Sequence, residues 1–185
     1  MNKELLKIFV LEDDEWYNRL LVHHLGMNKD VEVRSFFRGK ELLDNLNDRP
    51  DVITLDYRLP DVKGLALLRK IKMKRPGAEV IVISEQEDVQ TAVDLLKEGA
   101  FDYLVKNEEI QGRLQSVMGR IREKLSLQKR IEYLEQEVVN KYDFGNAVIG
   151  NSPAMARVME MMGKAVATDL TVTITGETGT GKEVV

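Results

Sequence analysis

Four groups of side chains that could do chemistry occur along the chain, each directly after a short apolar run. In chain order they are Glu12-Asp13-Asp14, Asp56, Ser84 and Lys106. If the apolar runs are strands of one parallel sheet, these groups converge at the carboxyl edge of that sheet. Clustered carboxylates repel one another, and a hard cation such as Mg²⁺ compensates their charge. A carboxylate beside Mg²⁺ and a lysine can accept a phosphoryl group, because both cations stabilise the phosphoryl oxygens.

These residues also have a simpler interpretation, because a single carboxylate at a strand end often caps the following helix. Four coincident positions favour the shared site over four unrelated caps. The nearby histidines, His23 and His24, are interpreted as packing or surface residues rather than phosphodonors. The aromatic residues Trp16 and Tyr17 are interpreted as packing residues.

A second candidate for phosphate chemistry is the glycine-rich stretch TITGETGTGKEVV, Thr173 to Val185. It fits the spacing Gly-x-x-x-x-Gly-Lys after a strand-like run, so backbone N–H groups could surround the phosphates while Lys182 reaches their oxygens. Glu183 occupies the position of the Ser or Thr that usually binds Mg²⁺. The predicted nucleotide site comprises Gly176, Glu177, Thr178, Gly179, Thr180, Gly181, Lys182 and Glu183.

The elements that must position the first site alternate between two patterns up to about residue 106. Apolar and β-branched runs predict strands over 7–11, 31–36, 52–55, 80–83 and 101–105. Amphipathic stretches predict helices over 16–25, 40–46, 65–73 and 89–97, and Gly99 stands where a C-terminal helix cap belongs. This alternation predicts an α/β fold with a parallel sheet wrapped on both faces.

Residues 108–141 carry two apolar stripes with steps of three and four residues. The first is Ile110, Leu114, Val117 and Ile121; the second is Leu127, Ile131, Leu134 and Val138. Ile121 and Leu127 are six positions apart, which predicts a break or a local change of winding between the two stripes. We interpret the region as a signalling helix that pairs with a second chain. The alternative is a last domain helix followed by an unrelated surface helix.

The region after residue 141 has too few elements for a core of its own. Ser152 and Pro153 form a good helix start, a helix is predicted over 154–166, and a strand over 170–175. One helix and one strand bury little apolar surface, so no independently stable domain is expected there.

Composition narrows the class of protein further. The chain has 185 residues and a net charge of −4, which suits one complete domain plus a fragment and argues against DNA binding by these residues. The absence of cysteine excludes disulfides, thiol catalysis and cysteine-ligated zinc, and suits a reducing cytoplasm. The first apolar run is too short for a signal peptide or a membrane span, so no membrane partner is expected.

Three stretches resemble the signatures of response-regulator receiver domains over about residues 5–121. They are IFVLEDDEWYNRLL, DVITLDYRLPDVKGLALLRKI and VIVISEQEDVQTAVDLLKEGAFDYLVK. The resemblance implies a flavodoxin-like five-stranded sheet of order 2-1-3-4-5. It also implies that a histidine kinase phosphorylates Asp56, with Asp13 as a direct Mg²⁺ ligand and Glu12 binding the metal through water. The backbone carbonyl of Arg58 would complete the protein ligands.

The acid pair has two possible registers, Glu12-Asp13 or Asp13-Asp14. We choose Glu12-Asp13, because two apolar residues immediately precede Glu12, as in the family pattern.

The same resemblance assigns the remaining groups of the receiver. Ser84 and Lys106 would contact the phosphoryl group, and Tyr103 would swing inward when Ser84 moves. Two residues depart from the family pattern. Glu85 stands beside Ser84 where a small residue is usual, and Asn107 replaces a proline, so the cis peptide bond of the family is not expected.

The stretches VIGNSPAM and TVTITGETGTGKE resemble the opening of the AAA+ ATPase domain of sigma-54-dependent activators, in which Glu183 is a normal residue. The whole chain is therefore similar to an NtrC-type activator that stops at its Walker A loop. Its regions would be a receiver domain (1–121), a helical or coiled-coil linker (108–141) and an AAA+ fragment (142–185).

The NtrC-type resemblance implies specific partners and cofactors. A kinase and a second copy of the chain would be partners, while ATP, sigma-54 polymerase and DNA would be bound only at full length. This chain should not hydrolyse ATP. The alternatives are a degenerate receiver that serves only as a dimerising module, and a P-loop NTPase active at full length.

Overall fold

The computed structural model describes residues 5–86, 88–141 and 152–166, together with residues 171, 173, 175–177 and 179. The chain divides into two compact units, Met1–Glu123 and Lys124–Val185. The first unit contains five strands. They are β1 (Leu6–Leu11), β2 (Val31–Phe36), β3 (Val52–Asp56), β4 (Glu79–Ser84) and β5 (Asp102–Val105).

The five strands form one parallel sheet, as the sequence pattern predicted, and their order β2-β1-β3-β4-β5 is the one that the family resemblance implied. Each central strand reads as a nearly continuous apolar run, because helices cover both of its faces. The order brings the ends of β1, β3, β4 and β5 to one edge of the sheet. Asp56 is paired in register with Ile83, and Ser84 with Val105.

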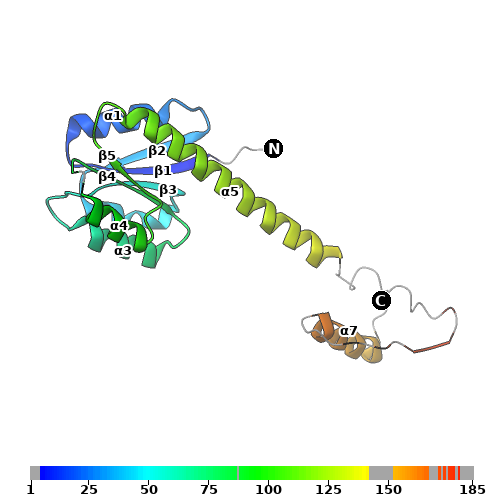
Figure 1. Ribbon diagram of the computed structural model, residues 1–185. Helices are drawn as coiled ribbons and strands as arrows, with labels where there is room; N and C mark the ends of the chain where they lie inside the picture. Colours follow the sequence, from blue (N-terminus) through cyan, green and yellow to red (C-terminus); the bar gives the residue numbers. More distant parts are fainter. Residues whose placement is uncertain are drawn as a thin grey trace. The chain divides into compact units, whose positions relative to one another are not determined.

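Helices cover the sheet on both faces, with α1 and α5 on one face and α3 and α4 on the other (Figure 1). The helices are α1 (Glu15–Gly26), α2 (Gly39–Asp44), α3 (Gly64–Lys74), α4 (Val89–Lys97), α5 (Ile110–Lys141) and α7 (Pro153–Val166), with a 3₁₀ turn η1 at Leu46–Asp48. The predicted helix over 40–46 is thus shorter than expected. Asn45 N donates to Leu42 O at 3.1 Å, a tighter i to i−3 bond that ends α2.

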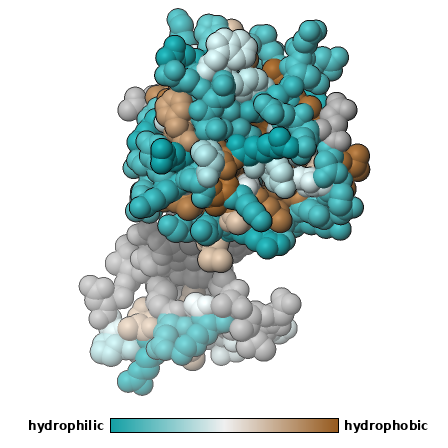
Figure 2. All heavy atoms as spheres, turned by 90° about the vertical axis from the view of Figure 1, so that its left-hand side faces the viewer, coloured by the Kyte–Doolittle hydropathy of each residue, from teal (hydrophilic) through white to brown (hydrophobic). Residues whose placement is uncertain are grey.

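The core follows the alternation of side chains along the strands. Phe9, Leu55 and Val82 point to the face covered by α2, α3 and α4, where they join Leu67 and Ile71 in one buried cluster. The intervening strand residues are buried on the opposite face. The surface at the left of Figure 1 is largely hydrophilic with smaller hydrophobic patches (Figure 2).

Two glycines are required by the backbone around these elements. A Cβ atom on Gly64, the first residue of α3, would lie 2.7 Å from the carbonyl oxygen of Tyr57, so any side chain would push α3 away from the end of β3. Gly99 has φ of +93°, which confirms the predicted helix cap after α4.

The predicted break between the two apolar stripes of residues 108–141 is absent, because α5 runs without interruption from Ile110 to Lys141. No proline or glycine lies between Ile121 and Leu127, so the backbone hydrogen bonds continue although the apolar face shifts. The first stripe is buried, with Ile121 fully covered. The first three residues of the second stripe are exposed, with Leu127 58%, Ile131 55% and Leu134 42% accessible.

In the second unit the predicted helix start is confirmed. The Oγ atom of Ser152 accepts a hydrogen bond from Met155 N at 3.2 Å, and α7 begins at Pro153. The strand expected over 170–175 falls partly on residues outside the described ones, and residues 171, 173 and 175 have no strand assignment. None of the described helices is long and apolar enough to cross a membrane.

Candidate functional site

Glu12 is held in place by hydrogen bonds around the end of β1. Its backbone N–H donates to Phe36 O at 3.2 Å, which ties it to the end of β2. The side-chain amide of Asn18, buried in α1, donates to both Glu12 O (3.0 Å) and Phe36 O (3.2 Å). Asn18 therefore fixes α1 against the two strand ends and sets the position of the acids.

The three acids after β1 have different environments. Asp14 caps α1, because its Oδ1 atom accepts a hydrogen bond from Tyr17 N at 2.7 Å. Glu12 and Asp13 each offer a carboxylate oxygen within 4.8 Å of one on Asp56. This geometry favours the register Glu12-Asp13 for the acid pair.

These three carboxylates fit a hard divalent cation. Carboxylate oxygens are the ligands that Mg²⁺ prefers, and Glu12 and Asp56 are buried while Asp13 is exposed, which leaves an open side for water. Arg58 lines the same cavity, and its N–H donates to Asp56 Oδ1 at 3.0 Å. A cation held here would offset charge that the buried carboxylates otherwise share with one lysine.

That lysine is Lys106, directly after β5. Its Nζ atom donates to Glu12 Oε1 at 2.9 Å and to Asp56 Oδ2 at 3.0 Å, and its side chain is only 11% exposed. Glu12 Oε2 lies 2.8 Å from the same nitrogen without hydrogen-bonding geometry, so it contributes to the ion pair alone. Lys106 N donates to Ser84 O at 2.8 Å, which continues the pairing of β4 with β5 to this residue.

The protonation of the acids reflects this crowding. The pKa of Glu12 is raised to about 7, mainly because the carboxyl is buried; the Lys106 ammonium opposes this increase and the nearby Asp56 carboxylate adds to it. Burial also raises the pKa of Asp13. Burial alone would lower the pKa of Lys106, but its contacts with Glu12 and Asp56 outweigh burial and raise it. The lysine is therefore a fixed positive charge, while Glu12 titrates near neutral pH.

Ser84 and Tyr103 are not among the residues that line the cavity of the acids. Ser84 is fully buried, and its Oγ atom accepts a hydrogen bond from Gln86 N at 3.2 Å. The hydroxyl of Tyr103 donates to the carbonyl oxygen of the same Gln86. Tyr103 is only 9% exposed, so its ring is already turned inward in this structure.

The acids open into a cavity of about 390 Å³ at the carboxyl edge of the sheet. Its lining is Glu12, Asp13, Asp14, Trp16, Tyr17, Asp56, Arg58, Glu85 and Lys106. The interpretation of Trp16 as a packing residue is wrong, because its side chain is 69% exposed. Tyr17 packs against Lys106 inside the site, a role that the sequence alone did not reveal. The available signal was the position of Tyr17 in the first turn of the helix that directly follows the acids.

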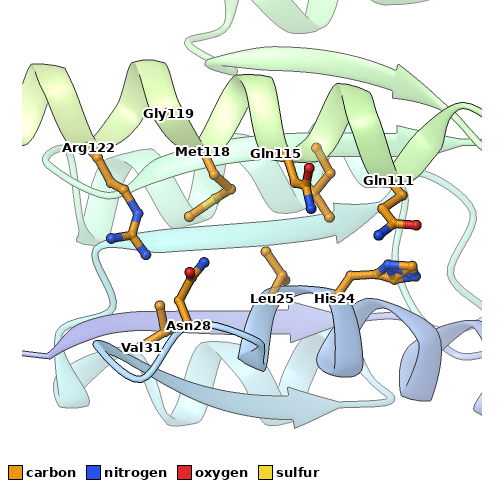
Figure 3. Close-up of a pocket in the computed structure, with 10 residues that line it drawn as sticks. His24, Leu25, Asn28, Val31, Gln111, Gln115, Met118, Gly119 and Arg122 are labelled. Carbon is orange, nitrogen blue, oxygen red and sulfur yellow. The ribbon is translucent and has the colours of Figure 1, made fainter.

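A second cavity of about 370 Å³ lies between α1 and α5 (Figure 3). Its lining is largely amide and aliphatic, and Figure 3 shows Arg122 extending from α5 toward Asn28 and Val31. Arg122 forms a two-bond ion pair with Asp30, at 2.7 and 3.2 Å. The two cavities are similar in volume, so their chemistry distinguishes them. No carboxylate lines the second one, and the acidic cavity is the better candidate site.

The glycine loop is described at three of its eight predicted residues. Gly176, Glu177 and Gly179 are exposed, and Gly179 has φ of +86°, a conformation that favours glycine. The other predicted residues of the nucleotide site lie outside the described ones. They are Thr178, Thr180, Gly181, Lys182 and Glu183.

Two protein families match the chain. Residues 8–117 match the response regulator receiver domain, and residues 148–185 match the sigma-54 interaction domain. The transcriptional regulator NtrC of Escherichia coli K12 is 33% identical over 182 residues. The alignment covers 96% of this chain and 37% of NtrC, so the chain spans little more than a third of that relative.

Solved structures agree with the fold. The receiver domain of a LuxO repressor protein from Vibrio parahaemolyticus superposes with a TM-score of 0.64 at 22% identity, over 69% of this chain and 98% of that one. NtrX from Brucella abortus, solved in complex with ADP, gives a TM-score of 0.63 at 28% identity, over 85% of this chain and 33% of NtrX. The matched residues, the sheet order and the acidic edge together show that the chain belongs to the response-regulator receiver family, followed by the start of a sigma-54 interaction domain.

Proposed function

We propose that Asp56 accepts a phosphoryl group from a histidine kinase in the cytoplasm, and that this modification controls sigma-54-dependent transcription through the ATPase region of the full-length protein. The observation that carries the proposal is the contact of one ammonium group, on Lys106, with both Glu12 and Asp56, next to the exposed Asp13. A site that combines several carboxylates with one fixed ammonium suits phosphoryl transfer better than acid–base catalysis, because the ammonium can stabilise the negative phosphoryl oxygens.

In the transfer step a carboxylate oxygen of Asp56 forms a bond to phosphorus, and the bond from phosphorus to the donor nitrogen of phosphohistidine breaks. The nitrogen keeps the electron pair of that bond. Lys106 stays within hydrogen-bonding distance of Asp56 and stabilises the negative phosphoryl oxygens. Glu12, Asp13 and Asp56 would hold Mg²⁺, with the Arg58 carbonyl as a further ligand. When bound, Mg²⁺ supplies positive charge to the transferred group.

A connection from this site to the surface runs through Gln86. Its N–H contacts Ser84 and its carbonyl contacts the Tyr103 hydroxyl, so a displacement of Ser84 changes the position of the residue that Tyr103 holds. We propose that phosphorylation shifts the population of this segment and of the following α4. Since the Tyr103 ring is already turned inward in this structure, we propose that phosphorylation increases the population of this inward arrangement rather than creating a new one.

The full-length partners proposed are a sensor histidine kinase, sigma-54 RNA polymerase, DNA and a second copy of the chain, with ATP bound at the glycine loop. Self-association is supported by the exposed stripe Leu127, Ile131 and Leu134, whose steps of four and three residues suit a coiled coil. A partner helix would cover apolar side chains that are otherwise in water.

The acceptor is tested with Mg²⁺ and a small phosphodonor, acetyl phosphate, followed by intact mass spectrometry. The wild-type chain should gain one phosphoryl group, and Asp56→Asn should gain none. Asp44→Asn is the matched control, because Asp44 is an exposed acid of α2, away from the cavity, and this variant should be modified normally. An unmodified wild-type chain would overturn the acceptor and favour a degenerate receiver.

Self-association is tested by sedimentation of Ile131→Glu against Gln128→Glu. Both substitutions place a carboxylate on an exposed position of α5, but only the first lies on the apolar stripe. Ile131→Glu should shift the chain toward monomer, whereas Gln128→Glu should sediment like the wild type. Equal behaviour of both variants would remove the stripe from the proposed interface.

A further inference from the structure

The ammonium of Lys106 has a third neighbour besides the two carboxylates. The ring of Tyr17 lies against it, with Nζ 4.6 Å from the ring centroid. This distance is well within the range of a cation–π contact. The ammonium is therefore held by Glu12 and Asp56 through hydrogen bonds and by an aromatic ring through its π electrons.

The ring, rather than the hydroxyl, makes this contact. The hydroxyl of Tyr17 is buried and has no hydrogen-bond partner among the described residues. Burial raises the pKa of this hydroxyl to about 12, so Tyr17 stays neutral and offers the ammonium no charge. What Tyr17 brings to the site is an aromatic face at a fixed position.

That position is fixed by the start of α1. Tyr17 N donates to the capping carboxylate of Asp14 at 2.7 Å, so the backbone of Tyr17 is tied to the loop that carries Glu12. Asp14 N in turn donates to Glu12 Oε1 at 3.3 Å. One short segment thus places both a carboxylate and a ring around the lysine that arrives from β5.

We propose that Tyr17 is a positioning residue, whose ring holds the Lys106 ammonium against Glu12 and Asp56. The inference rests on the proposed function only for its effect on phosphoryl transfer. Lysine has four rotatable side-chain bonds and a point charge, so without the ring its ammonium has more positions available. Since Lys106 is only 11% exposed, the contact falls at the stronger end of cation–π interactions, roughly a fivefold to thirtyfold effect on an equilibrium or a rate.

The first experiment compares Tyr17→Leu with Tyr17→Phe in phosphorylation by acetyl phosphate at saturating Mg²⁺. Tyr17→Leu should lower the rate at least fivefold, and Tyr17→Phe should restore most of that loss because it keeps the ring. Magnesium affinity should not weaken in Tyr17→Leu, because Tyr17 is not one of the proposed ligands. A general structural defect in Tyr17→Leu would instead lower both the phosphorylation rate and the Mg²⁺ affinity. Equal phosphorylation rates for Tyr17→Leu and Tyr17→Phe would overturn the inference.

The second experiment tests the contact without any phosphorylation. A double-mutant cycle combines Tyr17→Leu with Lys106→Met in metal-free protein, and urea unfolding measures the ratio of folded to unfolded chains. Tyr17→Leu should lower this ratio at least fivefold more in the wild-type background than in the Lys106→Met background. Equal effects in the two backgrounds would overturn the inference even if phosphorylation occurs.

The cycle also separates this inference from the proposed function. If the wild-type chain is not phosphorylated, the acceptor fails while the unfolding cycle still decides whether Tyr17 holds Lys106. Tyr17→Met is a second variant if the leucine variant does not fold. Phe101→Leu is the matched control, because it removes another ring from a cation, Arg120 at 5.2 Å, at the opposite end of β5. It should leave the Mg²⁺ affinity and the phosphorylation rate unchanged.

Discussion

The acidic cavity and the predicted glycine loop each include a lysine that we propose contacts phosphate, and their residues lie at very different separations along the chain. Lys106 contacts partners 94 and 50 residues away, Glu12 and Asp56. The predicted loop around Lys182 consists of consecutive residues. The first site therefore depends on the order of strands in a complete sheet, whereas the second depends on local backbone conformation.

The largest expected effect comes from removing the lysine of the acidic cavity. Lys106→Met leaves the buried Glu12 and Asp56 without their cation, and loss of one partner of a buried ion pair costs about 3–5 kcal/mol of unfolding free energy. Urea unfolding of metal-free protein at pH 8 measures this loss. The loss should shrink at pH 5, where Glu12 can take up a proton, and a pH-independent loss would contradict this explanation.

The next effect concerns Glu12 itself. Its pKa rises from an ordinary 4.5 to about 7 on folding, so the folded state binds this proton more tightly than the unfolded state. The stabilisation is complete below about pH 4.5 and is lost as the pH rises through about 7, a loss of up to about 3 kcal/mol. Urea unfolding of metal-free wild type and Glu12→Gln across this range should give a flatter curve for the variant. Parallel curves would assign the dependence to another group.

Binding of Mg²⁺ should raise the unfolding free energy, by an amount somewhat smaller than the preceding losses. At a concentration about a hundred times its dissociation constant, a ligand that binds only the folded state adds about 2.7 kcal/mol. Affinity should increase with pH as Glu12 loses its proton, and Asp13→Asn should weaken binding. The fluorescence of Trp16, the only tryptophan, reports binding because its ring lines the cavity. Unchanged affinity in Asp13→Asn would remove Asp13 from the ligands.

The smallest effect is expected from the lysine of the other region. Lys182→Ala should change the unfolding free energy of the receiver by less than about 0.5 kcal/mol and leave phosphorylation of Asp56 unchanged. Urea unfolding and intact mass spectrometry, run beside Lys106→Met, give the direct comparison. A loss comparable to that of Lys106→Met would show that the two regions are not independent.

The parallel sheet and most helix bounds could be predicted from the sequence, because alternating strand and helix patterns are local signals, whereas the strand order came from the family resemblance. The convergence of Glu12, Asp56 and Lys106 followed from that order. What surrounds these groups could not be predicted. The hydrogen bond from Asn18 to Glu12 and the contact of the Tyr17 ring with Lys106 both depend on how α1 packs against the strand ends. This packing is not visible in the local periodicity of the sequence.

The continuity of α5 shows a second limit of sequence patterns. The shift between the stripes ending at Ile121 and beginning at Leu127 changes which face is apolar, but it does not disturb the backbone. The same spacing also cannot distinguish a buried stripe from an exposed one. Ile121 is fully buried, while Leu127 is 58% exposed.

Lys106 is far from Glu12 and Asp56 in the sequence, so during translation the site is completed only after the two acids have been synthesised. Glu12 and Asp56 leave the ribosome long before Lys106, and domains fold from their N-terminal parts during translation. Until β5 has docked beside β4, the acids have no ammonium between them. An unfinished receiver therefore lacks the cation that the proposed phosphoryl transfer requires, so under that proposal only chains with a completed sheet would accept the phosphoryl group.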